Sequence, residues 1–188
     1  MSDKVFLRKK IKNLISLKND EELEAASKKI SSKVIKYITD NGFKHVGIYN
    51  SLNDEVSTDF IVDFCFINTI NVYMPKIQPN FKLDFFQVFK NEDWYENSDF
   101  KIKEPKVKED NGVDLSAMEI IIVPLVGFDS YKNRLGRGKG YYDRVLAQFP
   151  NTHKKIGIGF SFQMEDNVLP IDENDIPLDV IFTEKFTL

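Results

Sequence analysis

The sequence is short of the features that support disulfides, export and membrane spans. It has one cysteine, Cys65, which cannot form an internal disulfide and whose apolar neighbours predict a buried, inert thiol. Its longest apolar stretch, residues 120–128, is interrupted by Pro124 and Gly127 and is too short to cross a bilayer. The N-terminal segment also lacks the apolar core of a signal peptide. We therefore expect a cytoplasmic protein that does not bind membranes.

What is present is an ordinary globular composition, 42% hydrophobic and 29% charged, which predicts a single domain over residues 1–188. The net charge of −3 is unevenly distributed. Residues 1–20 hold six Lys/Arg against two acids and residues 129–155 hold seven against two, whereas residues 161–188 hold one against seven. This pattern argues against a nucleic-acid partner and suits a small polyanion such as a nucleotide, although charge counts alone favour ordinary solvated surface.

Two helices are predicted before the first strand. Apolar positions at helical spacing predict an amphipathic helix over residues 4–17 with a cationic outer face. Asn19 and Glu22 have the spacing of a capping box. The apolar stripe that follows them ends at Asn41-Gly42, which predicts the end of the second helix.

Strands and helices alternate in the rest of the chain. We expect strands at 45–49, 70–74, 82–89, 119–124, 155–160 and 180–183, and helices over 58–67 and 140–148. The β-branched run at 119–124 is typical of a central strand buried on both faces, whereas residues 91–114 are polar and irregular. The alternation predicts an α/β fold with three layers, α/β/α, doubly wound around a mostly parallel central sheet.

The most informative segment is 127–144, which follows the predicted central strand. Glycines stand at positions 136, 138 and 140, and Arg134, Arg137 and Lys139 interleave with them. Residues without Cβ let the backbone approach a ligand closely, and amides at the start of a helix favour anions. Cationic side chains and backbone amides would therefore converge on phosphate. The alternative is a flexible turn with solvated cations, which the three interleaved charges make the weaker interpretation.

Two common phosphate motifs do not fit this segment. A dinucleotide fingerprint needs G-x-G-x-x-G directly after a strand, but here the pattern is G-x-G-x-G and begins some twelve residues after Pro124. A Walker A loop needs Ser or Thr after its Gly-Lys, where this chain has Gly140. We therefore expect a phosphate site of another type.

The string Arg-Leu-Gly-Arg-Gly-Lys-Gly-Tyr-Tyr-Asp at 134–143 resembles the signature of the 5-formyltetrahydrofolate cyclo-ligases, also called 5,10-methenyltetrahydrofolate synthetases. The resemblance extends over nearly the whole chain, in the blocks Lys4 with Arg8, 49–58, Met74-Pro75-Lys76, Glu104-Pro105, Val123-Pro124, Gly127-Phe128-Asp129, Gln163, Leu169-Pro170 and 179–184. It implies a fold like that of the NagB/RpiA/CoA transferase group. It also implies a ligase of folate one-carbon metabolism that converts 5-formyltetrahydrofolate (folinic acid) into 5,10-methenyltetrahydrofolate, with ATP cleaved to ADP and phosphate.

The resemblance implies an ATP site in two parts. Lys4 and Arg8, four residues apart on the first predicted helix, would clamp the phosphate chain from one helix face; without the resemblance they would be solvated surface charges. The second part is the loop itself, namely Arg134, Leu135, Gly136, Arg137, Gly138, Lys139, Gly140, Tyr141 and Tyr142. Catalytic roles fall on Arg137, Lys139 and Tyr142.

The resemblance also implies a folate site and a magnesium site. The pterin ring would pair with Glu55, whose carboxylate can accept two parallel hydrogen bonds. Mg²⁺ would be held by Asp143 and Asp175, since one or two carboxylates suffice when water and phosphate complete the octahedron; for Asp143 the alternative is a charge that balances Arg144. Core packing explains Phe100 as well as stacking on folate does. The implied folate contacts are Asn50, Leu52, Glu55, Phe100, Arg137, Gly138, Lys139, Gly140 and Tyr141.

The implied chemistry needs no nucleophile from the protein. The formyl oxygen attacks the γ-phosphate of ATP to give a phosphorylated formyl group, an iminium phosphate, and N10 of the folate then adds as phosphate departs. Because the substrate supplies both nucleophiles, no Ser, Cys or His triad is required. The expected partners are therefore the two small-molecule substrates, ATP and 5-formyltetrahydrofolate, and the expected state is a monomer.

Overall fold

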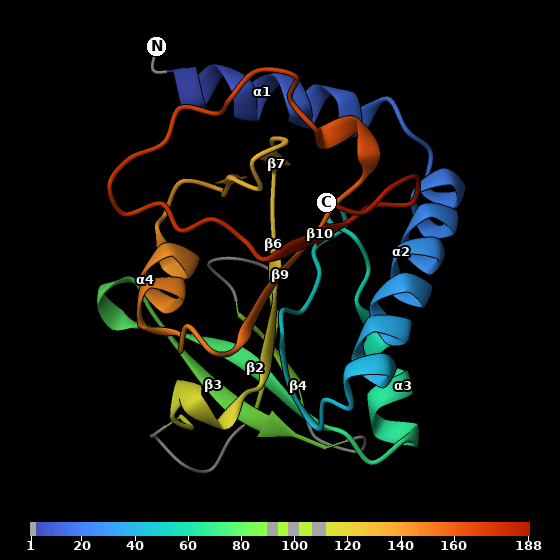
Figure 1. The fold of residues 1–188 in the computed structure, drawn as a ribbon, viewed down its shortest axis with the longest axis vertical. Helices are drawn as coiled ribbons and strands as arrows, with labels where there is room; N and C mark the ends of the chain where they lie inside the picture. The colour runs from blue at the N-terminus through green and yellow to red at the C-terminus, as the bar shows by residue number, and fades with distance from the viewer. Residues whose placement is uncertain (1–2, 90–93, 98–101, 107–111) are drawn as a thin grey trace.

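The computed structural model of the chain describes residues 3–89, 94–97, 102–106 and 112–188, whose path Figure 1 shows. The α-helices are α1 (Asp3–Ser16), α2 (Asp20–Asn41), α3 (Asp59–Ile67) and α4 (Tyr141–Gln148). The strands are β1 (His45–Ile48), β2 (Asn71–Gln78), β3 (Lys82–Val88), β4 (Trp94–Asn97), β5 (Ile102–Pro105), β6 (Ile120–Pro124), β7 (Gly127–Phe128), β8 (Arg134–Leu135), β9 (Lys154–Ile158) and β10 (Val180–Phe182). Short 3₁₀ helices are η1 (Pro79–Phe81), η2 (Leu115–Ala117) and η3 (Ser161–Gln163).

The two predicted N-terminal helices are confirmed, and the second begins and ends at the predicted signals. The backbone amide of Glu22 donates to Asn19 Oδ1 at 2.8 Å, and the amide of Asn19 donates to Glu22 Oε2 at 3.4 Å. These bonds complete the capping box at the start of α2. Gly42 ends the helix with φ +71°, a conformation that side chains disfavour.

The central sheet has the strand order β10-β9-β6-β1-β2-β3; β3 is antiparallel to β2 and the other pairs are parallel. The chain moves outward from β1 to β2 and β3 on one side, and from β6 to β9 and β10 on the other. The winding therefore reverses between β1 and β6, which is where sheets of this kind bind ligands. Helices α2 and α3 cover one face and α4 the other (Figure 1), so the predicted three-layer α/β fold is confirmed.

Strand β6 is buried on both faces, as predicted for the central strand. Ile120 and Ile122 pack in the layer with α2 and α3, whereas Ile121 and Val123 pack in the layer with α4. All four side chains are fully buried, and each contributes about 1.5–3 kcal/mol from the removal of apolar surface from water. β6 lies between β1 and β9, which fixes the strand in the middle of the sheet.

The structure contains strands in two segments that the sequence did not predict as strands. Residues 94–97 and 102–105, inside the segment expected to be irregular, pair as the antiparallel strands β4 and β5. β7 and β8 pair at the start of the glycine-rich segment. These strands are only two to four residues long, so no alternation of apolar and polar residues is visible in the sequence. β2 also extends beyond its predicted end because it pairs with β3 from Val72 to Gln78.

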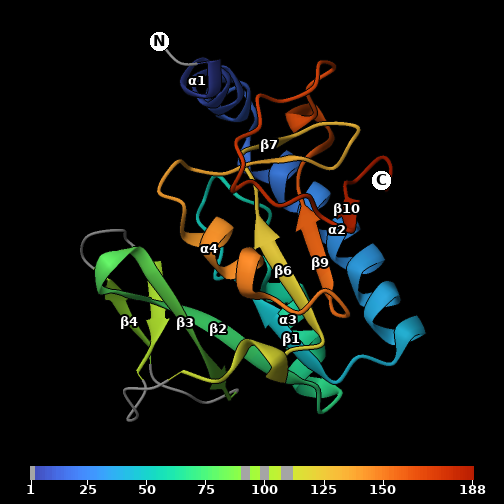
Figure 2. The ribbon, with the colours of Figure 1, turned by 60° about the vertical axis from the view of Figure 1, so that its left-hand side comes forward.

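The carboxyl ends of the parallel strands meet beneath α1. Figures 1 and 2 show α1 crossing this end of the sheet close to β7. Ile11 and Ile15 of α1 are buried against Leu135 and Leu169, which attaches the helix to the glycine-rich segment. The helix whose cations were predicted to meet a phosphate is therefore on the same side of the molecule as the predicted phosphate loop.

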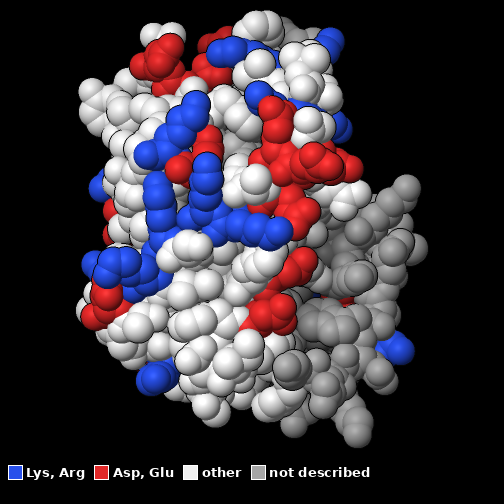
Figure 3. Space-filling view, turned by 90° about the vertical axis from the view of Figure 1, so that its right-hand side faces the viewer, with Lys and Arg blue, Asp and Glu red and all other residues white. Residues whose placement is uncertain are grey.

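The structure also addresses the features that the sequence lacks. Cys65 is buried, as predicted, and burial raises the pKa of its thiol to about 12. None of the described helices is both long and apolar enough to cross a membrane. On the face drawn in Figure 3, described Lys and Arg side chains gather in one group, and Asp and Glu side chains lie beside it.

Candidate active site

A cleft lies at the carboxyl ends of β1, β2 and β6, where the winding of the sheet reverses. Its empty space, together with the solvent at its mouth, amounts to about 900 Å³. The loop after β1, the hairpin of β2 and β3, and the glycine-rich segment with the first turn of α4 form its walls. The predicted site residues that line it are Asn50, Leu52, Glu55, Arg134 and Gly136–Asp143.

Asp129, a buried carboxylate, holds the start of the glycine-rich segment. Its Oδ1 accepts from the backbone amides of Tyr131 at 2.9 Å and Asn133 at 3.0 Å. Its Oδ2 accepts from the amide of Leu169 at 2.9 Å. Because a buried carboxylate is stable only with such partners, the turn between β7 and β8 is fixed and places Arg134 in the wall of the cleft.

Glycine is required at two positions of this segment. Gly138 and Gly140 have φ of +94° and +70°, in the left-handed region. A Cβ on Gly138 would lie 3.2 Å from Cζ of Arg8, so the missing side chain lets α1 approach the loop. Gly140 is the N-cap of α4 and offers no side chain to the amides of the first turn, the groups that favour anions at a helix start. The backbone of this segment therefore suits an anion.

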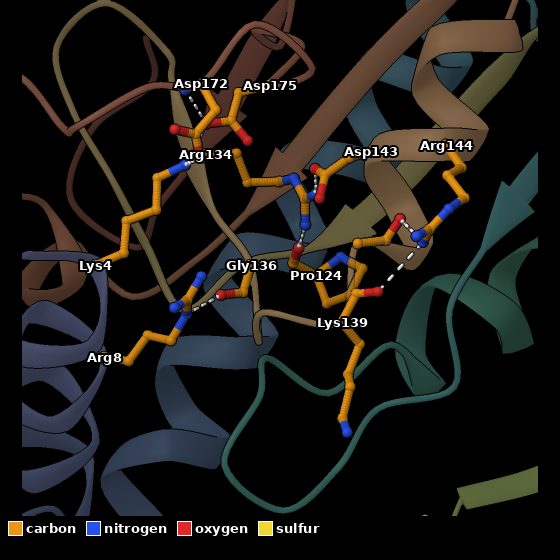
Figure 4. A network of polar contacts seen from close by, with 11 residues as sticks. Lys4, Arg8, Pro124, Arg134, Gly136, Lys139, Asp143, Arg144, Asp172 and Asp175 are labelled. Atoms are coloured by element: carbon orange, nitrogen blue, oxygen red, sulfur yellow. Dashed lines mark hydrogen bonds and ion pairs between the residues drawn. The ribbon is translucent and has the colours of Figure 1, made fainter. Parts of the chain in front are cut away.

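Arg134 is a buried cation that joins the glycine-rich segment to α4 (Figure 4). Only 4% of its side chain is exposed, and its Nη2 pairs with Asp143. Its Nη1 donates to the carbonyl oxygen of Pro124 at 3.2 Å, whereas its Nε is buried without a hydrogen-bond partner among the described residues. Asp143 thus balances Arg134, and not Arg144, which was the alternative partner considered from the sequence.

Helix α1 brings two further cations to this wall. Lys4 Nζ lies 2.6 Å from Asp172 Oδ2 and 2.5 Å from Asp175 Oδ2. Arg8 Nε donates to the carbonyl oxygen of Gly136 at 2.7 Å. Burial lowers the pKa of Lys4, but the hydrogen bonds and charges of the two aspartates outweigh burial and raise it. Figure 4 shows Arg8 directed from α1 toward Gly136 and Lys4 toward Asp172 and Asp175. Both cations leave α1 on the same side, as their helical spacing predicts.

Arg137 is held by two consecutive carboxylates. Its Nε donates to Glu55 Oε1 at 2.9 Å, and its Nη2 donates to Asp54 Oδ1. The other oxygen of Glu55 accepts from the backbone amide of Leu52 at 3.0 Å. Burial raises the pKa of Glu55 and Arg137 lowers it, with the balance above the usual value. With only 8% of its side chain exposed, Glu55 is a buried acceptor in the wall of the cleft.

Lys139 and Tyr142 line the cleft in different ways. Lys139 is exposed, and its ammonium forms no ion pair with a described residue. Figure 4 shows its side chain directed away from Arg134 and Asp143. Tyr142 is half-buried, and its ring centre lies 5.8 Å from Cζ of Arg134. Burial and the charge of Glu55 raise the pKa of Tyr142, so its hydroxyl stays protonated and can donate a hydrogen bond.

Asp143 and Asp175, the predicted magnesium ligands, lie on two sides of Arg134 (Figure 4). Burial raises the pKa of Asp175, but Lys4, the backbone amide of Asp172 and Arg134 together lower it, so the carboxylate is charged. The described residues contain no group of three or more His, Cys, Asp or Glu side chains that could hold a metal by themselves. Two carboxylates suit Mg²⁺ when water and phosphate complete its octahedron. The donor set therefore fits a metal that arrives with a phosphorylated ligand.

Four of the described site residues are not among those that line the cleft, namely Lys4, Arg8, Leu135 and Asp175. Arg8 lines a second cavity. Leu135 is buried against α1; Phe100 lies outside the described residues.

Other residues of the site were not predicted from the sequence. Asp54 and Asp172 hold Arg137 and Lys4, and a search of the neighbours of assigned residues would have found Asp54, which precedes Glu55. The further lining residues are Tyr49, Pro75, Ile77, Leu83, Glu104, Pro124, Leu125 and Val126; several of these directly follow β1 and β6, where the winding rule predicts a site.

Comparison with known proteins covers nearly the whole chain. A profile of the 5-formyltetrahydrofolate cyclo-ligase family matches residues 1–184. The chain is 31% identical to the 5-formyltetrahydrofolate cyclo-ligase of Haemophilus influenzae, over 92% of this chain and 90% of that protein. It is 30% identical to the enzyme of the same name from Mycoplasma pneumoniae, over 97% and 99%.

Two solved structures have the same fold. The 5,10-methenyltetrahydrofolate synthetase of Aquifex aeolicus superposes with a TM-score of 0.83 at 31% identity, over 98% of this chain and 91% of that chain. The synthetase of Mycoplasma pneumoniae superposes with a TM-score of 0.78 at 29% identity, over 97% and 99%. The likeness therefore includes the sheet and both helical layers as well as the glycine-rich segment. The chain belongs to the 5-formyltetrahydrofolate cyclo-ligase family.

Proposed function

We propose that this protein is an ATP-dependent ligase that cyclises 5-formyltetrahydrofolate to 5,10-methenyltetrahydrofolate, with release of ADP and phosphate. The observation that carries the proposal is the composition of one cleft. A buried carboxylate, Glu55, stands in the same cleft as Arg134, Arg137 and Lys139, and the backbone of the glycine-rich segment suits an anion. The names of the relatives support the same reaction.

The reaction has two steps. The formyl oxygen attacks the γ-phosphorus of ATP, a C–O–P linkage forms, and the bond between the γ-phosphorus and ADP breaks. N10 then adds to the formyl carbon and loses its proton, and the C–O bond breaks as inorganic phosphate leaves. The substrates supply every bond-forming atom, so the protein contributes orientation and charge neutralisation.

The cations that line the cleft and the two cations that α1 places beside it share this work. Lys4 and Arg8 hold the phosphate chain from α1, and Arg137 and Lys139 neutralise the charge on the transferred phosphoryl group. An arginine in such a position contributes on the order of 10³ or more in rate. Tyr142 donates its hydroxyl proton in a hydrogen bond to the same group. Arg134, which is buried in its pair with Asp143, keeps the loop in position beside the phosphates.

The folate is oriented from the other wall. Glu55 accepts hydrogen bonds from the amino group and adjacent N–H of the pterin, a pairing that a neutral side chain makes less well. Asn50 and Leu52 line the cleft next to it. Gly138, Gly140 and Tyr141 face the folate from the glycine-rich side, at the point where the formyl oxygen and the γ-phosphate meet.

Asp143 and Asp175 would hold Mg²⁺ together with the phosphate oxygens of ATP. When bound, the ion withdraws negative charge from the phosphates and orients them. Asp143 stays fixed at the start of α4 by Arg134, and Asp175 is kept ionised by Lys4. The chain thus supplies two charged oxygen ligands and leaves the remaining positions to substrate and water.

We also propose that the single domain of residues 1–188 works as a cytoplasmic monomer without nucleic-acid or membrane partners. The net charge of −3, and the Asp and Glu side chains beside the basic group in Figure 3, support the absence of a nucleic-acid partner. Light scattering tests the oligomeric state, and a mass near twice 21.8 kDa would contradict the monomer.

One assay tests the reaction. The protein is mixed with Mg²⁺, ATP and 5-formyltetrahydrofolate, and the absorbance of the conjugated methenyl product is followed together with ADP. We expect product and ADP in equal amounts, and neither when ATP is omitted. ADP without methenyl product would indicate phosphoryl transfer to another acceptor. Folate binding without either product would indicate a binding protein.

A further inference from the structure

Arg137 stands on the boundary between two cavities. One is the cleft, which also includes Glu55. The other lies beneath α1 and is lined in part by Arg8, Lys12 and Asp54. Arg137 lines both, and its two hydrogen bonds go one to each side, from Nε to Glu55 and from Nη2 to Asp54.

The bond to Glu55 joins the group that meets the pterin to a group that meets the phosphates. If the Arg137 guanidinium moves to a nucleotide, it loses its hydrogen bond to Glu55, whose side chain is only 8% exposed. Removing the partner of a buried charge is strongly unfavourable, because the remaining charge is neither solvated nor paired. The N–H donors of a pterin at Glu55 replace the lost partner and remove this penalty.

The bond to Asp54 has a different character. The Asp54 side chain is 31% exposed and that of Arg137 42%, so water can solvate this carboxylate after the guanidinium leaves. No folate donor has to replace the arginine there. A pair this exposed contributes little by itself. Asp54 therefore strengthens the hold only while Glu55 keeps the guanidinium beside it, and its bond to Arg137 opens once folate occupies Glu55. Asp54 faces the cavity that contains the α1 cations Arg8 and Lys12.

We propose that Arg137 couples the binding of the two substrates, an interlock in which folate binding frees the arginine for ATP. Asp54 is the positioning residue that sets the strength of this interlock. In the free protein Asp54 and Glu55 hold the guanidinium away from the nucleotide. When folate occupies Glu55, the guanidinium is released to the phosphates of ATP. This inference rests on the proposed function, because it takes folate and ATP as the two ligands of the cleft.

Two consequences follow from the interlock. Binding is reciprocal, so folate strengthens ATP binding and ATP strengthens folate binding by the same factor. The interlock also limits wasteful ATP cleavage, in which water attacks the γ-phosphorus in place of the formyl oxygen and ADP and phosphate are released. Without folate, the arginine that neutralises the transferred phosphoryl group stays with its carboxylates.

The test compares Asp54→Asn with the parent protein. The dissociation constant of the β,γ-methylene analogue of ATP, with Mg²⁺, is measured with and without saturating 5-formyltetrahydrofolate. In the parent we expect folate to tighten the analogue at least fivefold, the lower range of allosteric coupling. In Asp54→Asn we expect tighter analogue binding without folate and a coupling factor reduced about threefold or more, together with faster ADP release from ATP when folate is absent.

Two further variants separate positioning from general effects. Asp54→Glu keeps the charge and is expected to restore most of the coupling. Asp63→Asn, an equal charge change at an exposed position of α3, is expected to leave the coupling factor as in the parent. An unchanged factor in Asp54→Asn, or an equal change in Asp63→Asn, overturns the interlock.

The parent assay keeps this inference distinct from the proposed function. If the parent forms methenyl product but Asp54→Asn retains the parental coupling, only the interlock is wrong. If the parent forms no methenyl product with Mg²⁺ and ATP, the proposed function is wrong and the interlock is wrong with it.

Discussion

The guanidinium of Arg134 pairs with the carboxylate of Asp143 across the start of α4 and ties the glycine-rich segment to the helix that follows it. The arginine side chain is 4% exposed and the aspartate side chain 27%. The pair therefore has a buried end that fixes the loop and a more open end that faces the cleft. It gives Asp143 one orientation, which a carboxylate that shares a metal with a substrate requires.

Replacing Arg134 with Gln is expected to destabilise the protein by about 2–4 kcal/mol, because Asp143 loses its charged partner and the carbonyl of Pro124 loses a donor. Urea unfolding measures the change in free energy. Arg144→Gln is the matched control, since Arg144 is exposed, pairs with no described carboxylate, and donates to the carbonyls of Lys139 and Gly140. We expect less than about 1 kcal/mol there. Equal losses in the two variants would contradict the structural role of the Arg134 pair.

The two aspartates that contact Lys4 are expected to differ in their effect on magnesium. Asp175 has a side chain 20% exposed and lies beside Arg134, whereas that of Asp172 is 74% exposed. We expect Asp175→Asn to raise the Mg²⁺ concentration for half-maximal activity by about tenfold or more, because it removes one of the two proposed protein ligands. Asp172→Asn removes the same charge and is expected to raise it less than about threefold. The initial rate is measured as a function of Mg²⁺ concentration for both variants. A larger effect in Asp172→Asn than in Asp175→Asn would assign the metal to Asp172.

Much of the fold could be predicted from the sequence because its signals are local. The capping box at Asn19 and Glu22, the stop at Gly42 and the β-branched run of β6 act through neighbouring residues, and each stands where the sequence placed it. The β4–β5 and β7–β8 pairs were missed because strands of two to four residues are defined by their partner and not by their own pattern.

The candidate site followed the same division. The glycine-rich segment was recognised because its spacing is written in consecutive residues, whereas the contact from Arg137 to Asp54 joins residues 83 positions apart. Leu135 was taken with its neighbours as part of the nucleotide loop, but alternation along β8 turns its side chain toward α1 and leaves Arg134 facing the cleft wall. A run of residues in a motif does not show which of them point into the site.

The raised pKa of Glu55 predicts an acid limit for folate binding. Burial raises this pKa and Arg137 lowers it, with smaller lowering by the amide of Leu52 and raising by Asp54. As the pH falls through the pKa, the carboxylate gains a proton and no longer accepts both hydrogen bonds. We therefore expect folate affinity to fall at a higher pH than an ordinary glutamate, with its pKa of about 4.3, would give.

The direction of this limit can be tested with Arg137→Gln. Loss of the guanidinium removes the influence that lowers the pKa of Glu55. The acid limb of the pH profile, where folate affinity falls as the pH is lowered, should therefore move to still higher pH. Binding is followed by fluorescence titration at a series of pH values. In Glu55→Gln the limb should disappear, with weaker binding throughout. A limb that moves to lower pH in Arg137→Gln would show that another group controls it.

We expect the loss of Lys139 to lower turnover without weakening folate binding. Lys139 lines the cleft and its ammonium forms no ion pair with a described residue, so its removal breaks no ion pair within the described part of the chain. Lys139→Ala is expected to lower kcat by on the order of 10² or more and to change the KM for folate less than about threefold. Lys132→Ala, outside the lining, is the control. A higher KM for folate with an unchanged kcat would assign Lys139 to folate binding and not to the transferred phosphoryl group.

Glycine at position 138 serves the site and not only the backbone, and a comparison with Gly42 separates the two roles. Both have positive φ, +94° and +71°, so alanine at either is expected to destabilise the protein by about 1–2 kcal/mol. A Cβ at Gly42 meets nothing within 4 Å, whereas a Cβ at Gly138 meets Cζ of Arg8 at 3.2 Å. Gly138→Ala must therefore displace either the loop or the α1 arginine that the phosphates are proposed to contact.

We expect kcat/KM for ATP to fall about tenfold or more in Gly138→Ala and to stay at the parental value in Gly42→Ala. If both variants lost stability equally and both kept full activity, the approach of Arg8 to the loop would have no part in nucleotide binding.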